Sequence, residues 1–237
     1  MVTRPERLDL VLPVHNEAET IVATIDAWLA EAARLGIDLQ VLACEDGSSD
    51  GSGEVLQRAA VDRPLTAIIG TERKGYSRAV VDGIRASTAP VVCCVDSDGQ
   101  CDPADLGSVL DAWEASPPVA VGIRSPRQDP LARRLMSGSV RLVVRALHGV
   151  RLQDPSCPFV VVDGSLARSV AASDPILDQG YWWEFHVRLR SRGIRPVEVP
   201  VHHRARLAGT TRVYIPANLP RIASTHLVGL WRLRGED

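Results

Sequence analysis

The sequence predicts an α/β protein with a mostly parallel sheet and helices on both faces, and three observations lead to this fold class. Short apolar runs of strand length alternate with segments of helical periodicity through the first half of the chain. Those runs are almost continuously apolar, as strands buried on both faces are. No internal repeat, low-complexity tract or linker interrupts the 237 residues, so we expect a single domain.

The elements follow one another in a regular order. The expected strands are residues 8–14, 39–44, 65–71, 91–95, 119–124, 159–164 and 197–201. The expected helices are residues 17–35, 54–61, 76–86, one beginning near Pro103, 131–147, 181–192 and 216–233. Gly36 and Gly193 end two of these helices, and Pro103 suits a first helical turn.

Composition narrows the class of protein and its surroundings. A formal net charge of −2 predicts no general attraction to nucleic acid. The five cysteines are odd in number and include no C-x-x-C pair, which indicates buried thiols in a reducing compartment. No apolar stretch approaches the roughly 20 residues that span a bilayer. We therefore expect a cytoplasmic protein, in solution or in peripheral contact with the inner face of the cell membrane.

Acidic and amide side chains follow the fourth expected strand, where the chain reads VDSDGQ. Open α/β sheets bind ligands at the carboxyl ends of their strands. Asp96, Asp98 and Gln100 can gather three oxygen atoms on one side of an extended segment. Hard cations such as Mg²⁺ and Mn²⁺ take oxygen ligands and share them with substrate phosphates. A simple turn at Asp98 is the alternative, but Glu17 and Asp46 after other strands favour the cation.

Together with other segments, this motif resembles family 2 glycosyltransferases with the GT-A fold, particularly the polyprenol-phosphate mannose and glucose synthases. The matching segments are LPVHNEAETI, ACEDGSSDGS, ERKGYSRAVVDGI, VDSDGQCDP, VGIRSPRQDPLARRLMS, LQDPSCPF, GYWWEFHVRLRSRG, VEVPV and RLAGTTR. The resemblance implies a Rossmann-like GT-A domain. Residues 8–125 would bind the nucleotide sugar, and residues 126–237 would form the acceptor half with an amphipathic C-terminal helix.

The resemblance also implies an activity: an inverting, metal-dependent hexosyltransferase. The donor would be a GDP- or UDP-sugar, and the expected acceptor is a polyprenyl phosphate. A soluble biosynthetic transferase that glycosylates a hydroxyl group of a sugar nucleotide or natural product is one alternative. A binding module for sugar nucleotides without turnover is another.

Individual positions take their roles from the same resemblance. The residues implied at the donor nucleotide are Pro13, His15, Glu17 and Asp46. The implied metal ligands are Asp96, Asp98 and Gln100. The residues implied at the acceptor phosphate are Arg124, Arg133 and Ser137. Arg206 and Arg212 match the element that closes over the diphosphate, with Arg212 where the family has lysine.

The acceptor decides which further residues take part in the reaction. A phosphate is already anionic and needs only arginines such as Arg133 to place it, whereas a hydroxyl group needs a carboxylate base. Asp154 and Glu184 are the candidate bases. The alternatives are a turn cap at Asp154, a buried arginine pairing for Glu184 and a solvated helix face for Arg133. Pro158 replaces a glycine of the family beside the acceptor and puts the lipid acceptor in question.

Other enzyme classes fit the sequence less well. A dehydrogenase would place G-x-G-x-x-G after a strand, and a P-loop enzyme needs G-x-x-x-x-G-K; neither motif is present in the sequence. A nucleotidyltransferase would have a glycine-rich, basic phosphate loop where this chain has LPVHNEAE. The sequence therefore favours glycosyl transfer.

Overall fold

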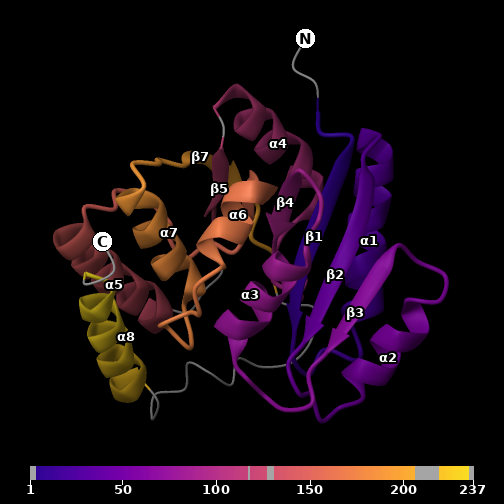
Figure 1. The fold of residues 1–237 in the computed structure, drawn as a ribbon, viewed down its shortest axis with the longest axis horizontal. Coiled ribbons are helices and arrows are strands. Elements are labelled where there is room, and N and C mark those ends of the chain that lie inside the picture. Colours follow the sequence, from indigo (N-terminus) through magenta and orange to yellow (C-terminus); the bar gives the residue numbers. More distant parts are fainter. Residues whose placement is uncertain (1–3, 117, 127–130, 206–218, 235–237) are drawn as a thin grey trace.

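Seven strands form one sheet in the computed structural model of the chain, in the order β3-β2-β1-β4-β6-β5-β7 (Figure 1). The structure describes residues 4–116, 118–126, 131–205 and 219–234, with the backbone alone at 131–136, 219–224 and 227. The strands are β1 Arg7–Val14, β2 Asp38–Glu45, β3 Leu65–Ile69, β4 Val91–Cys94, β5 Val119–Arg124, β6 Val160–Asp163 and β7 Val197–Val201. Of these strands, β6 alone runs antiparallel to its neighbours, β4 and β5.

Helices cover both faces of the sheet (Figure 1). On one face α3 and α6 pack on the strands with α7 against them, and α1, α2 and α4 form the opposite layer. α5 and α8 pack against each other and against α7 at the side of the molecule. The helices are α1 Ile21–Leu35, α2 Ser52–Ala59, α3 Tyr76–Ala86, α4 Leu106–Ala115, α5 Leu131–His148, α6 Gly164–Val170, α7 Tyr181–Ser191 and α8 Leu219–Leu233, with a 3₁₀ turn at Pro103–Asp105.

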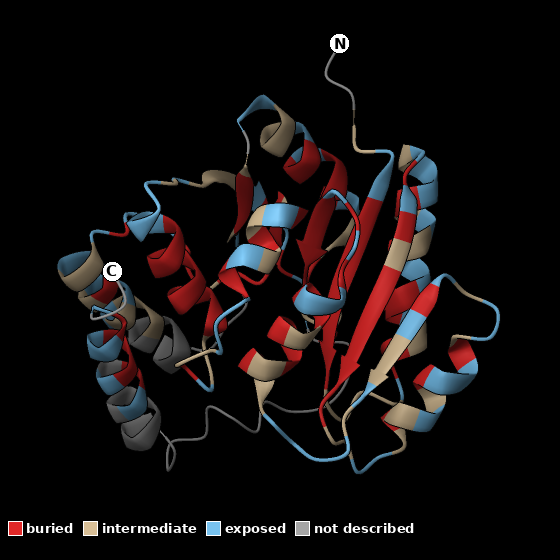
Figure 2. Ribbon diagram, in the orientation of Figure 1, coloured by how far each residue is buried: buried red, intermediate tan, exposed pale blue. Residues whose placement is uncertain are grey.

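The central strands are buried along nearly their whole length, as their apolar sequences predict (Figure 2). The buried positions of β1 are apolar except for Asp9, whose carboxylate is buried as well. Its Oδ2 accepts hydrogen bonds from the backbone N–H groups of Thr88 (2.6 Å) and Ala89 (2.8 Å). A buried polar group needs such partners. Asp9 therefore fixes the connection between α3 and β4, and with it the position at which β4 begins.

A second apolar cluster joins α5, α7 and α8. It contains Val144, Val150, Leu177, Trp183, Val187, Leu230 and Leu233. α8 thus packs through Leu230 and Leu233, while Val228 and Trp231 on the same helix are 51% and 68% exposed. In the part of the chain that the structure describes, no helix combines the length and apolar character needed to cross a membrane.

Most predicted elements agree with the observed ones to within a few residues, and two differences lie near the site or in the helical layer. The first helix begins at Ile21 and not at Glu17, because residues 18–20 form a turn in which the N–H group of Thr20 donates to the Glu17 carbonyl at 3.1 Å. The short helix α6 (Gly164–Val170) was not predicted. Its seven residues are too few to produce a clear helical period.

Close packing of α3 on the sheet gives the first prediction. A Cβ atom at Gly83 would lie 2.5 Å from Val11 Cγ1 and 2.7 Å from Cys44 Sγ. We expect Gly83→Ala to lower the free energy of unfolding by about 1–3 kcal/mol, because the core must move to accept a methyl group. Urea denaturation measures this change.

Gly138 in α5 provides the matched control, since a Cβ atom there would have nothing within 4 Å in the described structure. Gly138→Ala should raise stability by about 0.5–1 kcal/mol through helix propensity. Equal stability of wild type and Gly83→Ala would contradict the packing described here.

Candidate active site

Polar residues follow the carboxyl ends of the parallel strands, which lie at the bottom of Figure 1. β1, β2, β4 and β5 share one direction, so the segments that leave them emerge at the same edge. β6 runs the other way and begins there. The predicted site residues at this edge are Pro13, His15, Glu17, Asp46, Asp96, Asp98, Gln100, Arg124 and Asp154. The fold therefore brings to one edge residues that the sequence predicted separately for the donor, the metal ion and the acceptor.

The segment after β1 is fastened to the loop after β2. His15 Nδ1 lies 3.0 Å from the carbonyl oxygen of Asp46. A carbonyl only accepts, so Nδ1 carries the proton and Nε2 can accept from Asn16 Nδ2 at 3.3 Å. The backbone N–H of Glu17 donates to Ser52 Oγ at 2.9 Å. Hydrogen bonds thus hold His15 and Glu17 beside the loop that follows β2. Their contact with a nucleoside stays a prediction.

Asp46 organises the segment that leads into α3. Its Oδ1 accepts from the backbone N–H of Lys74 at 2.6 Å, and its two oxygens accept from the N–H of Gly75 at 3.1 and 3.0 Å. The carboxylate is buried. Asp46 therefore holds the start of α3 against the end of β2, and its predicted contact with the base or ribose is not tested by this geometry.

The VDSDGQ segment turns sharply after β4. Asp98 is 6% exposed, and its Oδ1 accepts from the backbone N–H of Gln100 at 3.1 Å. The turn passes through Gly99 at φ 73°, a conformation that favours glycine. Gln100 Nε2 donates to the carbonyl oxygen of Arg204 at 3.2 Å. This bond orients the amide and leaves its oxygen as the end available for a cation.

Asp96, the first carboxylate of the motif, is held by a chain of hydrogen bonds between side chains. Trp182 Nε1 donates to Tyr76 Oη at 2.8 Å, and Tyr76 Oη donates to Asp96 Oδ1 at 2.8 Å. Burial and the Asp96 carboxylate raise the pKa of Tyr76 well above its ordinary value, so the hydroxyl group stays protonated. In the same loop, Ser97 Oγ donates to the carbonyl of Pro13 at 2.8 Å.

The donor set at this loop suits a hard divalent cation. Asp96 and Asp98 supply carboxylate oxygens and Gln100 supplies an amide oxygen, which are the ligand types that Mg²⁺ and Mn²⁺ prefer. Among the described residues no group of three or more His, Cys, Asp or Glu side chains is placed to hold a metal ion. Two carboxylates and one amide oxygen supply part of an octahedral shell, and substrate phosphates and water would supply the rest.

The five cysteines are all buried and none is paired in a disulfide, as the sequence predicted. Cys101 lies directly behind the acidic loop. Burial, with neighbouring groups that include Asp96 and Asp98, raises the pKa of its thiol well above the ordinary value. The thiol is therefore protonated at neutral pH and would be a weak metal ligand. The candidate metal ligands of the loop are its oxygen atoms.

Arg124 and Asp154 form a buried bidentate ion pair at the end of β5. Arg124 Nε lies 2.7 Å from Asp154 Oδ2, and Nη2 lies 2.8 Å from Oδ1. Ser156 Oγ accepts from Arg124 Nη2 at 2.7 Å and donates to Asp154 Oδ1 at 3.0 Å. The side chains are 5% and 4% exposed. The guanidinium charge is therefore balanced within the protein, and removing either partner would leave an uncompensated buried charge.

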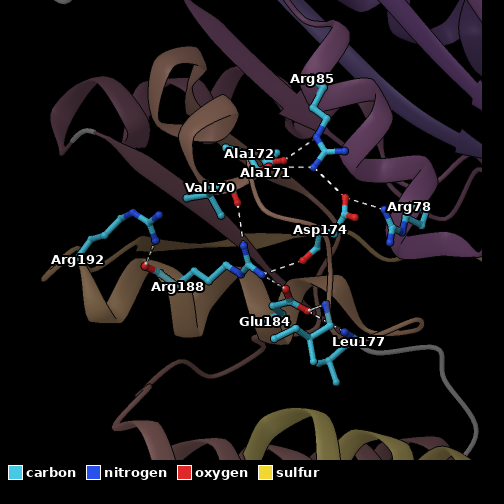
Figure 3. Close-up of polar contacts among 11 residues, drawn as sticks. Arg78, Arg85, Val170, Ala171, Ala172, Asp174, Leu177, Glu184, Arg188 and Arg192 are labelled. Carbon is cyan, nitrogen blue, oxygen red and sulfur yellow. Dashed lines mark hydrogen bonds and ion pairs between the residues drawn. The ribbon is translucent and has the colours of Figure 1, made fainter. Parts of the chain in front are cut away.

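Glu184 is fully buried in α7 (Figure 3). Its Oε2 accepts from the backbone N–H groups of Ile176 and Leu177, both at 2.8 Å. Its Oε1 lies 2.7 Å from Arg188 Nη2. This is the buried arginine pairing that the sequence offered as the alternative to a base. The carboxylate fixes the segment before α7, and a role as general base gains no support from its surroundings.

The remaining predicted residues lie partly or wholly outside the described structure. Arg206 and Arg212 lie outside the described residues, and at Arg133 only the backbone of α5 is described. Ser137 is partly buried on the same helix. Their roles at the diphosphate and at the acceptor phosphate stay predictions.

His186 in α7 is a buried histidine that sequence analysis did not single out. It is 1% exposed, and neither ring nitrogen has a hydrogen-bond partner among the described residues. Burial lowers its pKa to about 3, against a smaller opposite effect of Asp154. The imidazole is therefore neutral, and its helical position among apolar residues carried no signal of a special role.

The sheet order and the acidic carboxyl edge agree with the GT-A fold. The model of "Glycosyl transferase family 2" matches residues 9–175, which is most of the chain and runs from β1 to the segment after α6. The chain belongs to glycosyl transferase family 2.

Curated relatives share about a quarter to a third of their aligned residues with this chain. The undecaprenyl-phosphate 4-deoxy-4-formamido-L-arabinose transferase of Pectobacterium carotovorum is 28% identical over 159 residues, which cover 66% of this chain and 49% of the relative. The protein of the same name from Pseudomonas fluorescens (strain Pf0-1) is 28% identical over 220 residues, covering 90% and 61%. The chain thus spans about half to three-fifths of the length of these relatives.

Solved structures share the fold at low sequence identity. Glucosyl-3-phosphoglycerate synthase from Mycobacterium tuberculosis, in complex with Mn²⁺, UDP-glucose and phosphoglyceric acid, has a TM-score of 0.69 at 18% identity, over 95% of this chain and 80% of that chain. A mannosyltransferase from Pyrobaculum calidifontis, in complex with GDP-Man and Mn²⁺, has a TM-score of 0.66 at 20% identity, over 99% and 65%. Both likenesses support the GT-A fold.

The buried histidine predicts a dependence of stability on pH. The unfolded chain protonates His186 near pH 6.5, whereas the folded chain does so only near pH 3, so stability falls as the pH falls between these values. From pH 7 to pH 5 this group should lower the free energy of unfolding by about 2 kcal/mol. His186→Leu should therefore lose less stability than wild type over this range, measured by urea denaturation at both pH values.

His202→Gln is the control with the opposite sign. His202 is exposed, and its hydrogen bond to Asp105 raises its pKa. Protonated His202 therefore adds stability at low pH. Its removal should leave the acid sensitivity unchanged or slightly greater. Parallel declines in wild type and His186→Leu would contradict the neutral, unpaired imidazole.

Proposed function

We propose that this chain transfers a hexose from a GDP- or UDP-sugar to the phosphate group of a polyprenyl phosphate, with inversion at the anomeric carbon. The observation that carries the proposal is that both candidate bases are engaged elsewhere. Asp154 is bound by Arg124 through two hydrogen bonds, and Glu184 is bound by Arg188 and two backbone amides. A hydroxyl acceptor needs its proton removed, whereas a phosphate oxygen does not. The geometry therefore favours an acceptor that is already anionic.

The donor would bind at the carboxyl edge of β1, β2 and β4. Asp96, Asp98 and Gln100 would hold Mg²⁺ or Mn²⁺ together with the diphosphate. When bound, such a cation offsets the negative charge that develops on the leaving diphosphate. Pro13, His15 and the buried Asp46 loop would line the nucleoside. The Mn²⁺ and nucleotide sugars bound in the neighbouring structures support this assignment.

The acceptor would approach from β5 and α5. Arg133 and Ser137 of α5 would receive its phosphate, with Arg206 and Arg212 closing over the donor diphosphate. The names of the curated relatives, which specify undecaprenyl phosphate, support a lipid phosphate as acceptor. On this proposal the protein works at the inner face of the cell membrane through peripheral contact.

A matched pair of acceptors tests the proposal. We would incubate the protein with Mn²⁺, a panel of GDP- and UDP-sugars, and either a short polyprenyl phosphate or the corresponding polyprenol, with product read by mass spectrometry. Product is expected from the phosphate and not from the alcohol. Asp98→Asn should lower turnover about a hundredfold or more, because it removes a charged ligand of the diphosphate site.

Asp111→Asn serves as the control, because Asp111 is an exposed carboxylate on α4 that pairs with Arg4. It should retain wild-type turnover. Transfer to 3-phosphoglycerate or another soluble hydroxyl acceptor, with none to polyprenyl phosphate, would overturn the proposed acceptor. Full turnover of Asp98→Asn would overturn the proposed metal site.

A further inference from the structure

The two hydrogen bonds that lead from Trp182 through Tyr76 to Asp96 have only one possible direction. The indole N–H of Trp182 can donate but has no acceptor atom, so it occupies a lone pair of Tyr76 Oη. The single proton of the tyrosine hydroxyl then points to Asp96 Oδ1, 2.8 Å away. A hydrogen bond from a fixed donor holds Asp96 Oδ1 in place and restricts rotation of the carboxylate. Trp182 and Tyr76 together therefore set the orientation of the carboxylate that opens the acidic loop.

Further polar contacts link α3, which carries Tyr76, to the segment that leads into α7, which carries Trp182. Asp174, between α6 and α7, lies 2.6 Å from Arg78 Nη1 and 3.1 Å from Arg85 Nη2, both on α3 (Figure 3). Arg85 Nε also donates to the carbonyl of Ala171 at 2.7 Å. Close to Tyr76, the backbone N–H of Ser77 donates to the carbonyl of Asp178 at 3.3 Å. Tyr76 is thus held against the start of α7, where Trp182 lies.

Glu184 and Arg188 of α7 also bind the segment that precedes this helix (Figure 3). Glu184 accepts from the N–H groups of Ile176 and Leu177, and Arg188 donates to the carbonyls of Val170 at 3.2 Å and Asp174 at 3.0 Å. These bonds hold the segment 170–177 on α7. The indole of Trp182 therefore has little freedom to leave Tyr76.

We propose that Tyr76 is a positioning residue for the metal-ligating carboxylate of Asp96, and that Trp182 fixes Tyr76 in that role. The inference rests on the proposed function, because it assumes that Asp96 binds a divalent cation. Partners that hydrogen-bond a ligating carboxylate commonly control metal affinity. Since α7 lies in the acceptor half of the chain, the geometry of the donor metal site depends on that half.

Tyr76→Phe and Tyr181→Phe form a matched pair of variants. Each removes one hydroxyl oxygen from a packed tyrosine, but Tyr181 Oη has no hydrogen-bond partner among the described residues. We would titrate each protein with Mn²⁺ alone and follow free Mn²⁺ by electron paramagnetic resonance. The Kd for Mn²⁺ should rise about tenfold in Tyr76→Phe and stay at the wild-type value in Tyr181→Phe.

Trp182→Phe extends the test along the chain of hydrogen bonds. It keeps an aromatic ring near Phe185 but removes the N–H group, so its Kd for Mn²⁺ should rise by a smaller factor than in Tyr76→Phe. In the Tyr76→Phe background the same change should add nothing further, because the two residues act through one bond.

The outcomes separate this inference from the proposed function. Wild-type protein that takes up no Mn²⁺, whether Mn²⁺ is given alone or together with GDP or UDP, would overturn both. Wild-type uptake with an unchanged Kd in Tyr76→Phe would overturn only the positioning role. Equal weakening in Tyr76→Phe and Tyr181→Phe would assign the effect to general packing and would also overturn it.

Discussion

The common direction of six strands is the constraint on which the rest of this structure depends. β1, β2 and β4 are paired in parallel, so the segments after them must emerge at one edge. Each of those segments carries a carboxylate: Glu17, Asp46 and Asp96. The antiparallel β6 reverses the chain and starts at the same edge, which places Asp154 beside Arg124. The strand pairing thus concentrates charge that the linear sequence distributes over more than a hundred residues.

Most of this charge is neutralised or fixed by specific partners. Backbone amides hold Asp46, a guanidinium holds Asp154, and a tyrosine hydroxyl holds Asp96. The ion pairs around Asp174 and Glu184 then fasten α3 to α7 (Figure 3). Buried carboxylates are tolerated only with such partners. These partners give the edge a defined geometry. Within that edge, the VDSDGQ loop carries the oxygen atoms that suit a divalent cation.

The sequence was sufficient for the parallel sheet and for the acidic edge, because apolar runs and the residues that follow them are local signals. It was insufficient wherever two distant segments meet. Tyr76 and Asp96 are 20 residues apart and Trp182 lies 106 residues from Tyr76, so no spacing pattern connects them. The Arg124–Asp154 pair, 30 residues apart, was likewise invisible as a pair. For Glu184 the sequence allowed a base or a buried pairing, and only the packing of α7 showed the second.

A crystal structure with Mn²⁺ and a nucleoside diphosphate would test the central claim, that the carboxyl edge of β4 binds a metal-diphosphate complex, most directly. The account predicts a Mn²⁺ ion with Asp96, Asp98 and the diphosphate among its oxygen ligands at about 2.1 Å, and with Asp96 still accepting a hydrogen bond from Tyr76. A diphosphate bound away from β4, or bound there without any carboxylate ligand to the ion, would contradict it.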